Sequence, residues 1–105
     1  MLSVFEYLDY RQYLEAWIKS LGTRAYGCKG RLASALGISS SLVSQILKRE
    51  KTLTPDQTSD LCDFLGLNEI ESEFLHLLVD FDRAGNPRFR GKLQKRIAQL
   101  RLQAQ

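Results

Sequence analysis

The sequence predicts an all-α domain of five to six helices. Apolar residues recur at steps of three and four along every long segment, which is the period of a helix with one buried face. No segment alternates apolar and polar residues in the manner of a half-buried strand. The chain has 105 residues, of which 44% are hydrophobic, and this is enough for a single packed core.

The first expected helix spans residues 5–21 and carries an aromatic face. Its apolar residues follow the helical period and are Tyr7, Tyr10, Leu14, Trp17, Ile18 and Leu21. Charged residues occupy the opposite side of this helix, namely Asp9, Arg11, Glu15 and Lys19. We expect Gly22 to follow the end of the helix and the aromatic face to pack against the fifth or sixth helix.

Capping residues and glycines mark five further helices. Ser39, Thr54 and Asn68 stand where a side-chain oxygen can accept a hydrogen bond from a free N–H at the start of a helix. Thr54 and Asn68 are each followed three residues later by Gln or Glu, which completes a capping box. The expected ranges are about 29–36, about 40–48, 55–65, about 69–82 and about 88–103, with breaks at Gly37, Gly66 and Gly85-Asn86-Pro87.

The helices at 29–36 and 40–48 predict a helix-turn-helix. Ala33 is small enough for the second helix to cross closely, and Gly37 permits the positive φ of a tight turn. We expect Ile38, Val43 and Ile46 to face the core. The other side chains then form one polar, outward face, which consists of Ser40, Ser41, Ser44, Gln45 and Lys48.

This polar face suits the major groove of double-stranded DNA. Small hydroxyls permit a close approach, Gln45 can form two hydrogen bonds with an adenine edge, and Lys48 can bind phosphate or guanine. A solvated helix surface explains the same face equally well, because polar surfaces are common.

Residues 28–67 resemble the helix-turn-helix domain of the Cro/C1-type (Xre-like) DNA-binding family. The resemblance rests on Leu-Ala-x-x-Leu-Gly-Ile-Ser at 32–39, on the serine-rich start of the next helix, and on a capped helix that ends Leu-Gly-Leu at 65–67. The family commonly has a glycine after the recognition helix, whereas this chain continues Leu47-Lys48-Arg49 there.

The resemblance to the Cro/C1-type family implies two groups of DNA contacts. The base-contacting group is Ser40, Ser41 and Gln45, with Ser44 beside them. The phosphate-contacting group is Lys29, Lys48 and Lys51, and we add Arg31 and Arg49 to it as neighbouring cations.

An aromatic stretch near the N-terminus is similar to the opening of a second family, which consists of uncharacterised bacterial helix-turn-helix proteins. The stretch reads Phe5-Glu6-Tyr7-x-Asp9-Tyr10-Arg11-x-x-Leu14. Members of that family are longer and continue into another helical region. The resemblance therefore implies that this chain is a short relative or a fragment of a regulator.

The charges divide the chain into a helical domain, residues 1–82, and a basic C-terminal helix, residues 83–105. The first part holds 8 basic and 12 acidic residues, whereas the second holds 7 basic residues and no acidic residue. We expect the C-terminal helix to pack on the domain or in a dimer through its apolar stripe of Phe89, Leu93, Ile97 and Leu100. Its basic face suits phosphate contacts or a solvated surface.

Together these features predict a sequence-specific DNA-binding protein, a cytoplasmic bacterial transcriptional regulator that acts as a homodimer. The alternative is a protein-interaction module that keeps the helix-turn-helix without specific DNA binding. Two cysteines and one histidine are too few for a zinc site, and no apolar run approaches the roughly 20 residues that span a membrane. We expect no enzyme activity, no cofactor, no metal and no membrane partner.

Overall fold

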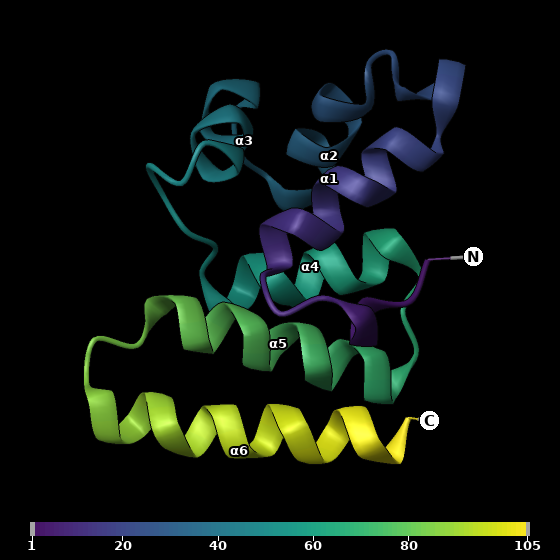
Figure 1. Cartoon of the computed structure of the whole chain (residues 1–105). Coiled ribbons are helices and arrows are strands. Elements are labelled where there is room, and N and C mark those ends of the chain that lie inside the picture. Colours follow the sequence, from purple (N-terminus) through teal and green to yellow (C-terminus); the bar gives the residue numbers. More distant parts are fainter. Residues whose placement is uncertain (1, 105) are drawn as a thin grey trace.

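A computed structural model describes residues 2–104, and the all-α prediction is confirmed over that range. The helices are α1 (Tyr10–Ser20), α2 (Cys28–Leu36), α3 (Ser40–Leu47), α4 (Pro55–Leu65), α5 (Glu69–Arg83) and α6 (Pro87–Gln103). Two short 3-10 turns, η1 (Val4–Glu6) and η2 (Gly22–Ala25), flank α1. Figure 1 shows α3 at one end of the molecule and α6 at the other, with α4 and α5 between them.

The capping residues start the helices at the predicted positions. Ser39 accepts from the N–H of Leu42 at 3.1 Å and so caps α3. Thr54 and Gln57 exchange hydrogen bonds in both directions at the start of α4, and the Asn68 capping box at the start of α5 has the same form. Each cap satisfies backbone N–H groups that lack a partner within the helix, which fixes where the helix begins.

The first helix begins five residues later than the sequence predicts. Residues 4–6 form a 3-10 turn instead, and α1 starts at Tyr10 because Asp9 takes an extended conformation and accepts from the N–H of Arg11 at 2.8 Å. Phe5 and Tyr7 consequently lie outside the helix. Phe5 packs on Phe74 of α5, with the ring centroids 5.0 Å apart.

The aromatic face of α1 packs only partly as predicted, because α1 contacts α5 but also packs on α4. The Trp17 ring lies edge-on against Phe64 of α4, with centroids 5.7 Å apart, rather than against α5 or α6. Tyr10, Tyr13 and Leu14 are buried in a core to which all six helices contribute.

The basic C-terminal helix α6 packs on α5 and on the η1 turn. Leu93, Ile97 and Leu100 are buried there, while Phe89 at the start of α6 is 49% exposed. Within residues 2–104, no helix is both long and apolar enough to cross a membrane.

Arg11 is buried, although the sequence places it on the polar side of the first helix. Its side chain is only 5% exposed, and each of its three nitrogens donates a hydrogen bond. Nε donates to the carbonyl of Ile46 at 2.6 Å, Nη2 donates to the carbonyl of Lys51 at 2.7 Å, and Nη1 donates to Asp82 at 2.8 Å. One guanidinium therefore joins the start of α1 to the end of α3, the following loop and the end of α5.

A short chain of hydroxyl groups completes this network. The Thr52 hydroxyl donates to the second oxygen of Asp82 at 2.7 Å, so the Tyr10 hydroxyl, 2.9 Å from Thr52, donates to Thr52. Burial alone would raise the pKa of Asp82, but the hydrogen bonds from Arg11 and Thr52 outweigh it and lower that pKa below its ordinary value of 3.8.

Replacing Arg11 by Met should strongly destabilise the protein. The substitution removes the cation that pairs with Asp82, together with the hydrogen bonds that Arg11 donates to the carbonyls of Ile46 and Lys51. We expect the free energy of unfolding in urea to fall by about 3–5 kcal/mol. The matched control is Gln12→Met at the neighbouring exposed position, where the change should stay within about 0.5 kcal/mol. Equal effects of the two substitutions would show that the network adds no stability.

The lowered pKa of Asp82 predicts a loss of stability in acid. Because the folded protein holds this carboxylate ionised below the pKa it has when unfolded, the unfolded chain takes up the proton first as the pH falls. The free energy of unfolding should therefore decline as the pH drops below 3.8, and the decline should be smaller in Asp82→Asn. Asp60→Asn, at an exposed carboxylate, should keep the wild-type slope. Identical slopes in both variants would contradict the assignment.

Candidate nucleic-acid interface

The turn between α2 and α3 has the glycine geometry that the sequence predicts. Gly37 has a φ of +66°, and the N–H groups of Gly37 and Ile38 return to the carbonyls of Ser34 and Ala33. These bonds satisfy the last carbonyls of α2 and turn the chain directly into α3. Ile38 is half-buried, while Val43 and Ile46 anchor the inner side of α3 in the core.

The four residues predicted to contact bases lie on α3 with different exposure. Ser40, Ser41 and Gln45 are exposed at its outer side. Ser44 is half-buried and lines a groove of about 300 Å³ between α1, α2 and α3. The structure therefore brings three of the four residues onto one open surface and sets Ser44 at its edge.

The groove beside Ser44 collects positive charge from three helices. Lys19 of α1, Lys29 of α2 and Lys48 at the end of α3 line it, with Glu15 as the one acidic residue. Lys29 and Lys48 were predicted as phosphate contacts, whereas Lys19 was missed. A sequence signal for Lys19 existed, since residues 16–49 contain six basic residues and no acidic residue.

The other predicted phosphate contacts have partners within the protein or lie apart from the groove. Arg31 is exposed, but its guanidinium donates to the carbonyls of Arg24 at 2.7 Å and Tyr26 at 3.2 Å, which holds the η2 segment beside α2. The Lys51 side chain is exposed in the loop after α3, and its carbonyl accepts from Arg11.

Arg49 lies in the turn that follows α3 and has a backbone conformation that glycine usually adopts. Its φ is +68°, and the N–H groups of Arg49 and Glu50 return to the carbonyls of Ile46 and Gln45. This is the hydrogen-bond pattern found at Gly37 and Gly66, so the missing glycine is replaced without a change in the shape of the turn. A side chain at positive φ strains the backbone.

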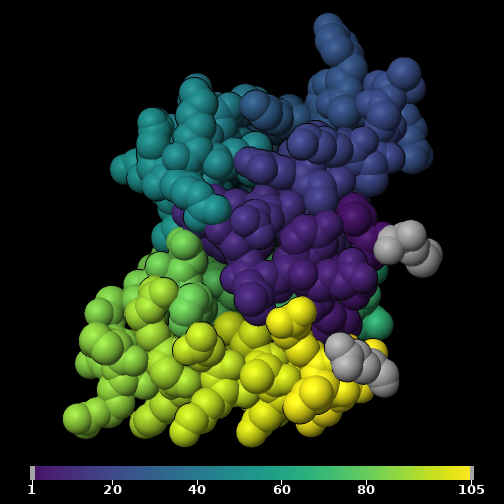
Figure 2. Space-filling view, in the orientation of Figure 1, coloured from purple at the N-terminus to yellow at the C-terminus, as the bar shows by residue number. Residues whose placement is uncertain are grey.

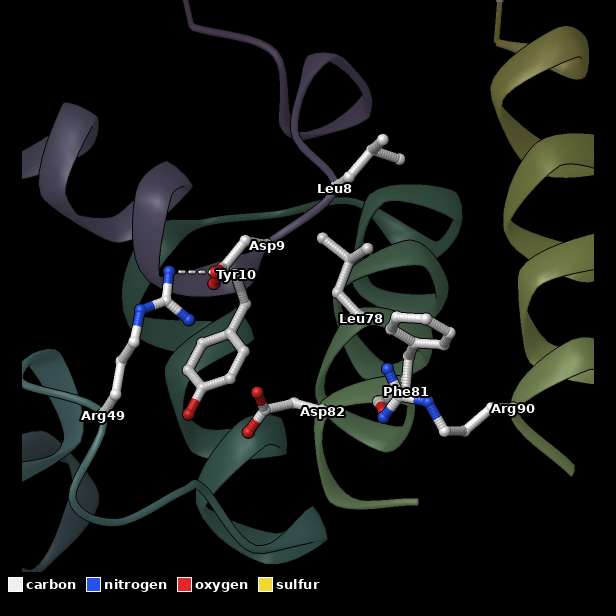
Figure 3. Close-up of a pocket in the computed structure, with 8 residues that line it drawn as sticks. All are labelled: Leu8, Asp9, Tyr10, Arg49, Leu78, Phe81, Asp82 and Arg90. Carbon is white, nitrogen blue, oxygen red and sulfur yellow. Dashed lines mark hydrogen bonds and ion pairs between the residues drawn. The ribbon is translucent and has the colours of Figure 1, made fainter. Parts of the chain in front are cut away.

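The Arg49 guanidinium forms an ion pair with Asp9, the residue that caps α1. Figure 3 shows these two side chains pointing toward each other beside a cavity of about 220 Å³. Phe81 and Arg90 form the other side of that cavity, where the Arg90 guanidinium lies 4.0 Å from the Phe81 ring centroid. The hydrogen bond that Arg49 donates to Asp9 raises the pKa of Arg49, so this cation stays charged.

The α2–α3 end of the molecule and α6 lie at opposite ends of the face drawn in Figure 2. The cations of α6 therefore do not extend the surface formed by Ser40, Ser41 and Gln45. Among the described residues, no group of three or more His, Cys, Asp or Glu side chains could hold a metal ion.

Comparisons with protein-family models, with curated proteins and with solved structures found no match to this chain. The resemblance to the Cro/C1-type family therefore stays a prediction.

Replacing Arg49 should separate its backbone strain from its ion pair. Arg49→Ala removes the pair with Asp9 and keeps a side chain at positive φ, whereas Arg49→Gly removes the pair and relieves the strain. We expect Arg49→Gly to melt at a clearly higher temperature than Arg49→Ala in thermal unfolding followed by circular dichroism. Equal melting temperatures would mean that the turn is unstrained.

Proposed function

We propose that the chain binds double-stranded DNA sequence-specifically, with α3 in the major groove, and acts as a transcriptional regulator. The observation that carries this proposal is the open polar surface of Ser40, Ser41 and Gln45, flanked by lysines in a stretch of chain without acidic residues. A polyanion that approaches that surface meets three lysines in the adjoining groove and a single carboxylate, Glu15.

The dimensions of α3 support an approach through the major groove. An α-helix with its side chains is about 10–12 Å across, and the major groove of B-DNA is about 12 Å wide. Gln45 offers a donor and an acceptor to an adenine edge, and the short serines let the helix come close. Base reading is thus assigned first to Gln45 and then to Ser40 and Ser41.

The start of α2 supports a phosphate contact beside α3. Gly27 precedes α2 without a side-chain cap, so N–H groups of the first turn are free to bind an anion. Gly30 has open space at the position of a Cβ, which permits a phosphate to come near. Lys29 stands in the same turn, and Lys19 and Lys48 line the adjoining groove.

Substitutions on α3 and at its end should separate sequence reading from phosphate binding. Gln45→Ala should reduce discrimination against the wrong base by about 1–3 kcal/mol. Lys48→Ala should weaken binding to all duplexes alike and reduce the salt slope of log K by about one. The measurement is a selection from random DNA, followed by titration of the selected duplex at several salt concentrations.

Lys92→Ala on α6 is the matched control for Lys48→Ala, because it removes the same charge at the opposite end of the molecule. It should leave the affinity for a single duplex unchanged. If binding does not respond to Gln45→Ala or to Lys48→Ala, the docking of α3 is wrong. If the folded wild-type protein retards no duplex even at low salt, DNA binding itself is wrong and the protein-interaction module is favoured.

A further inference from the structure

The outer face of α6 carries a row of three exposed cations. Arg88, Lys92 and Lys95 are spaced four and three residues apart, which places them on one side of the helix over about 10 Å. None of them forms an ion pair with another described residue. Other cations of the helix are bound within the molecule, as Arg90 is to the carbonyls of Phe81 and Ala84.

The outer face of α4 carries three exposed carboxylates at the same spacing. Asp56, Asp60 and Asp63 are four and three residues apart and lie on one side of the helix. They too form no ion pair with residues 2–104. The two rows therefore match in number, spacing and exposure, and they are opposite in charge.

Two members of these rows oppose the dipoles of their own helices. Arg88 is the second residue of α6, a helix without an acidic residue in its first turn. Asp63 lies in the last turn of α4, a helix without a basic residue there. A helix N-terminus disfavours a cation and a C-terminus disfavours an anion, so neither residue stabilises its own helix. A contact that brings Arg88 to Asp63 would remove both conflicts.

We propose that α6 of one copy lies antiparallel along α4 of a second copy. Arg88 then faces Asp63, Lys92 faces Asp60, and Lys95 faces Asp56. In this register Arg88 lies directly opposite Asp63, and Lys95 lies directly opposite Asp56. Lys92 and Asp60 are offset by one residue, about 1.5 Å along the helix axis, and a lysine side chain can span that offset.

A second copy fits the α6 row better than DNA does. A duplex held by α3 does not reach α6, because the two helices lie at opposite ends of the molecule (Figures 1 and 2). Exposed ion pairs are individually weak and are screened by salt, so the contact is weak in isolation. It gains strength where two copies are already held close together. The contact itself does not depend on DNA binding.

Charge reversal tests the pairing without weakening either helix. The variants are R88E/K92E and D60K/D63K. The first puts an acidic side chain at a helix start and the second puts a basic side chain at a helix end, and both changes agree with the helix dipoles. Because the contact is weak, sedimentation equilibrium is run at high protein concentration, where the wild type should self-associate at about 20 mM salt and lose that association at about 300 mM. Each double variant should lower the association constant at least about tenfold, and the four-residue combination should restore it to within about twofold.

Two controls separate this pairing from net charge. K48E/K51E makes the same charge change as R88E/K92E, and E6K/E15K makes the same change as D60K/D63K. Both should keep wild-type association. The proposal is overturned if the wild type does not associate at low salt, if the four-residue reversal fails to restore association, or if K48E/K51E abolishes it equally. It is also overturned if R88E/K92E weakens binding to a single DNA duplex while self-association persists.

Discussion

The buried guanidinium of Arg11 fixes the position of α3 in this fold. A charge held away from water must have its hydrogen bonds satisfied, and Arg11 satisfies them with the carbonyls of Ile46 and Lys51 and with Asp82. Those partners belong to the end of α3, the following loop and the end of α5. Because a guanidinium is planar and rigid, the three segments are held at fixed relative positions. Arg11 therefore sets the orientation of α3, and with it the orientation of the surface proposed to read DNA.

Asp9 couples the same region to the start of α1. One of its oxygens accepts from the N–H of Arg11 and the other pairs with Arg49, so a single carboxylate caps α1 and meets the residue that ends α3. This shared role explains why α1 begins at Tyr10 rather than at residue 5. It also gives a reason for an arginine at a position of positive φ, since a glycine there would leave Asp9 without its cation.

The features predicted correctly from the sequence are those fixed by near neighbours in the chain. A cap such as Thr54 with Gln57, or a turn such as Gly37, depends on residues within one helical turn, and the exposure of Gln45 follows from the period of α3. Arg11 could not be placed in this way, because its side-chain partners lie 35 to 71 residues away. A helical period assigns a charged residue to solvent unless a buried acceptor is known. Lys19 lies in a stretch of chain without acidic residues, but its place beside Ser44 depends on the packing of α1 against α3, which the sequence alone does not specify.

Arginines and lysines serve different purposes in this molecule. Five arginines donate to backbone carbonyls and so hold loops and helix ends in place, and these are Arg11, Arg31, Arg83, Arg90 and Arg101. Arg49 and Arg96 instead pair with carboxylates. The guanidinium offers several donors in one plane and is weakly hydrated, whereas the lysine ammonium keeps its water.

The charge that remains for a partner is therefore carried mainly by lysines, with Lys19, Lys29 and Lys48 gathered beside α3 and Lys92 and Lys95 on α6. The net charge of +3 describes neither the surface beside α3 nor the surface of α6. It counts the cations that are already bound within the fold together with the cations that are available to a partner.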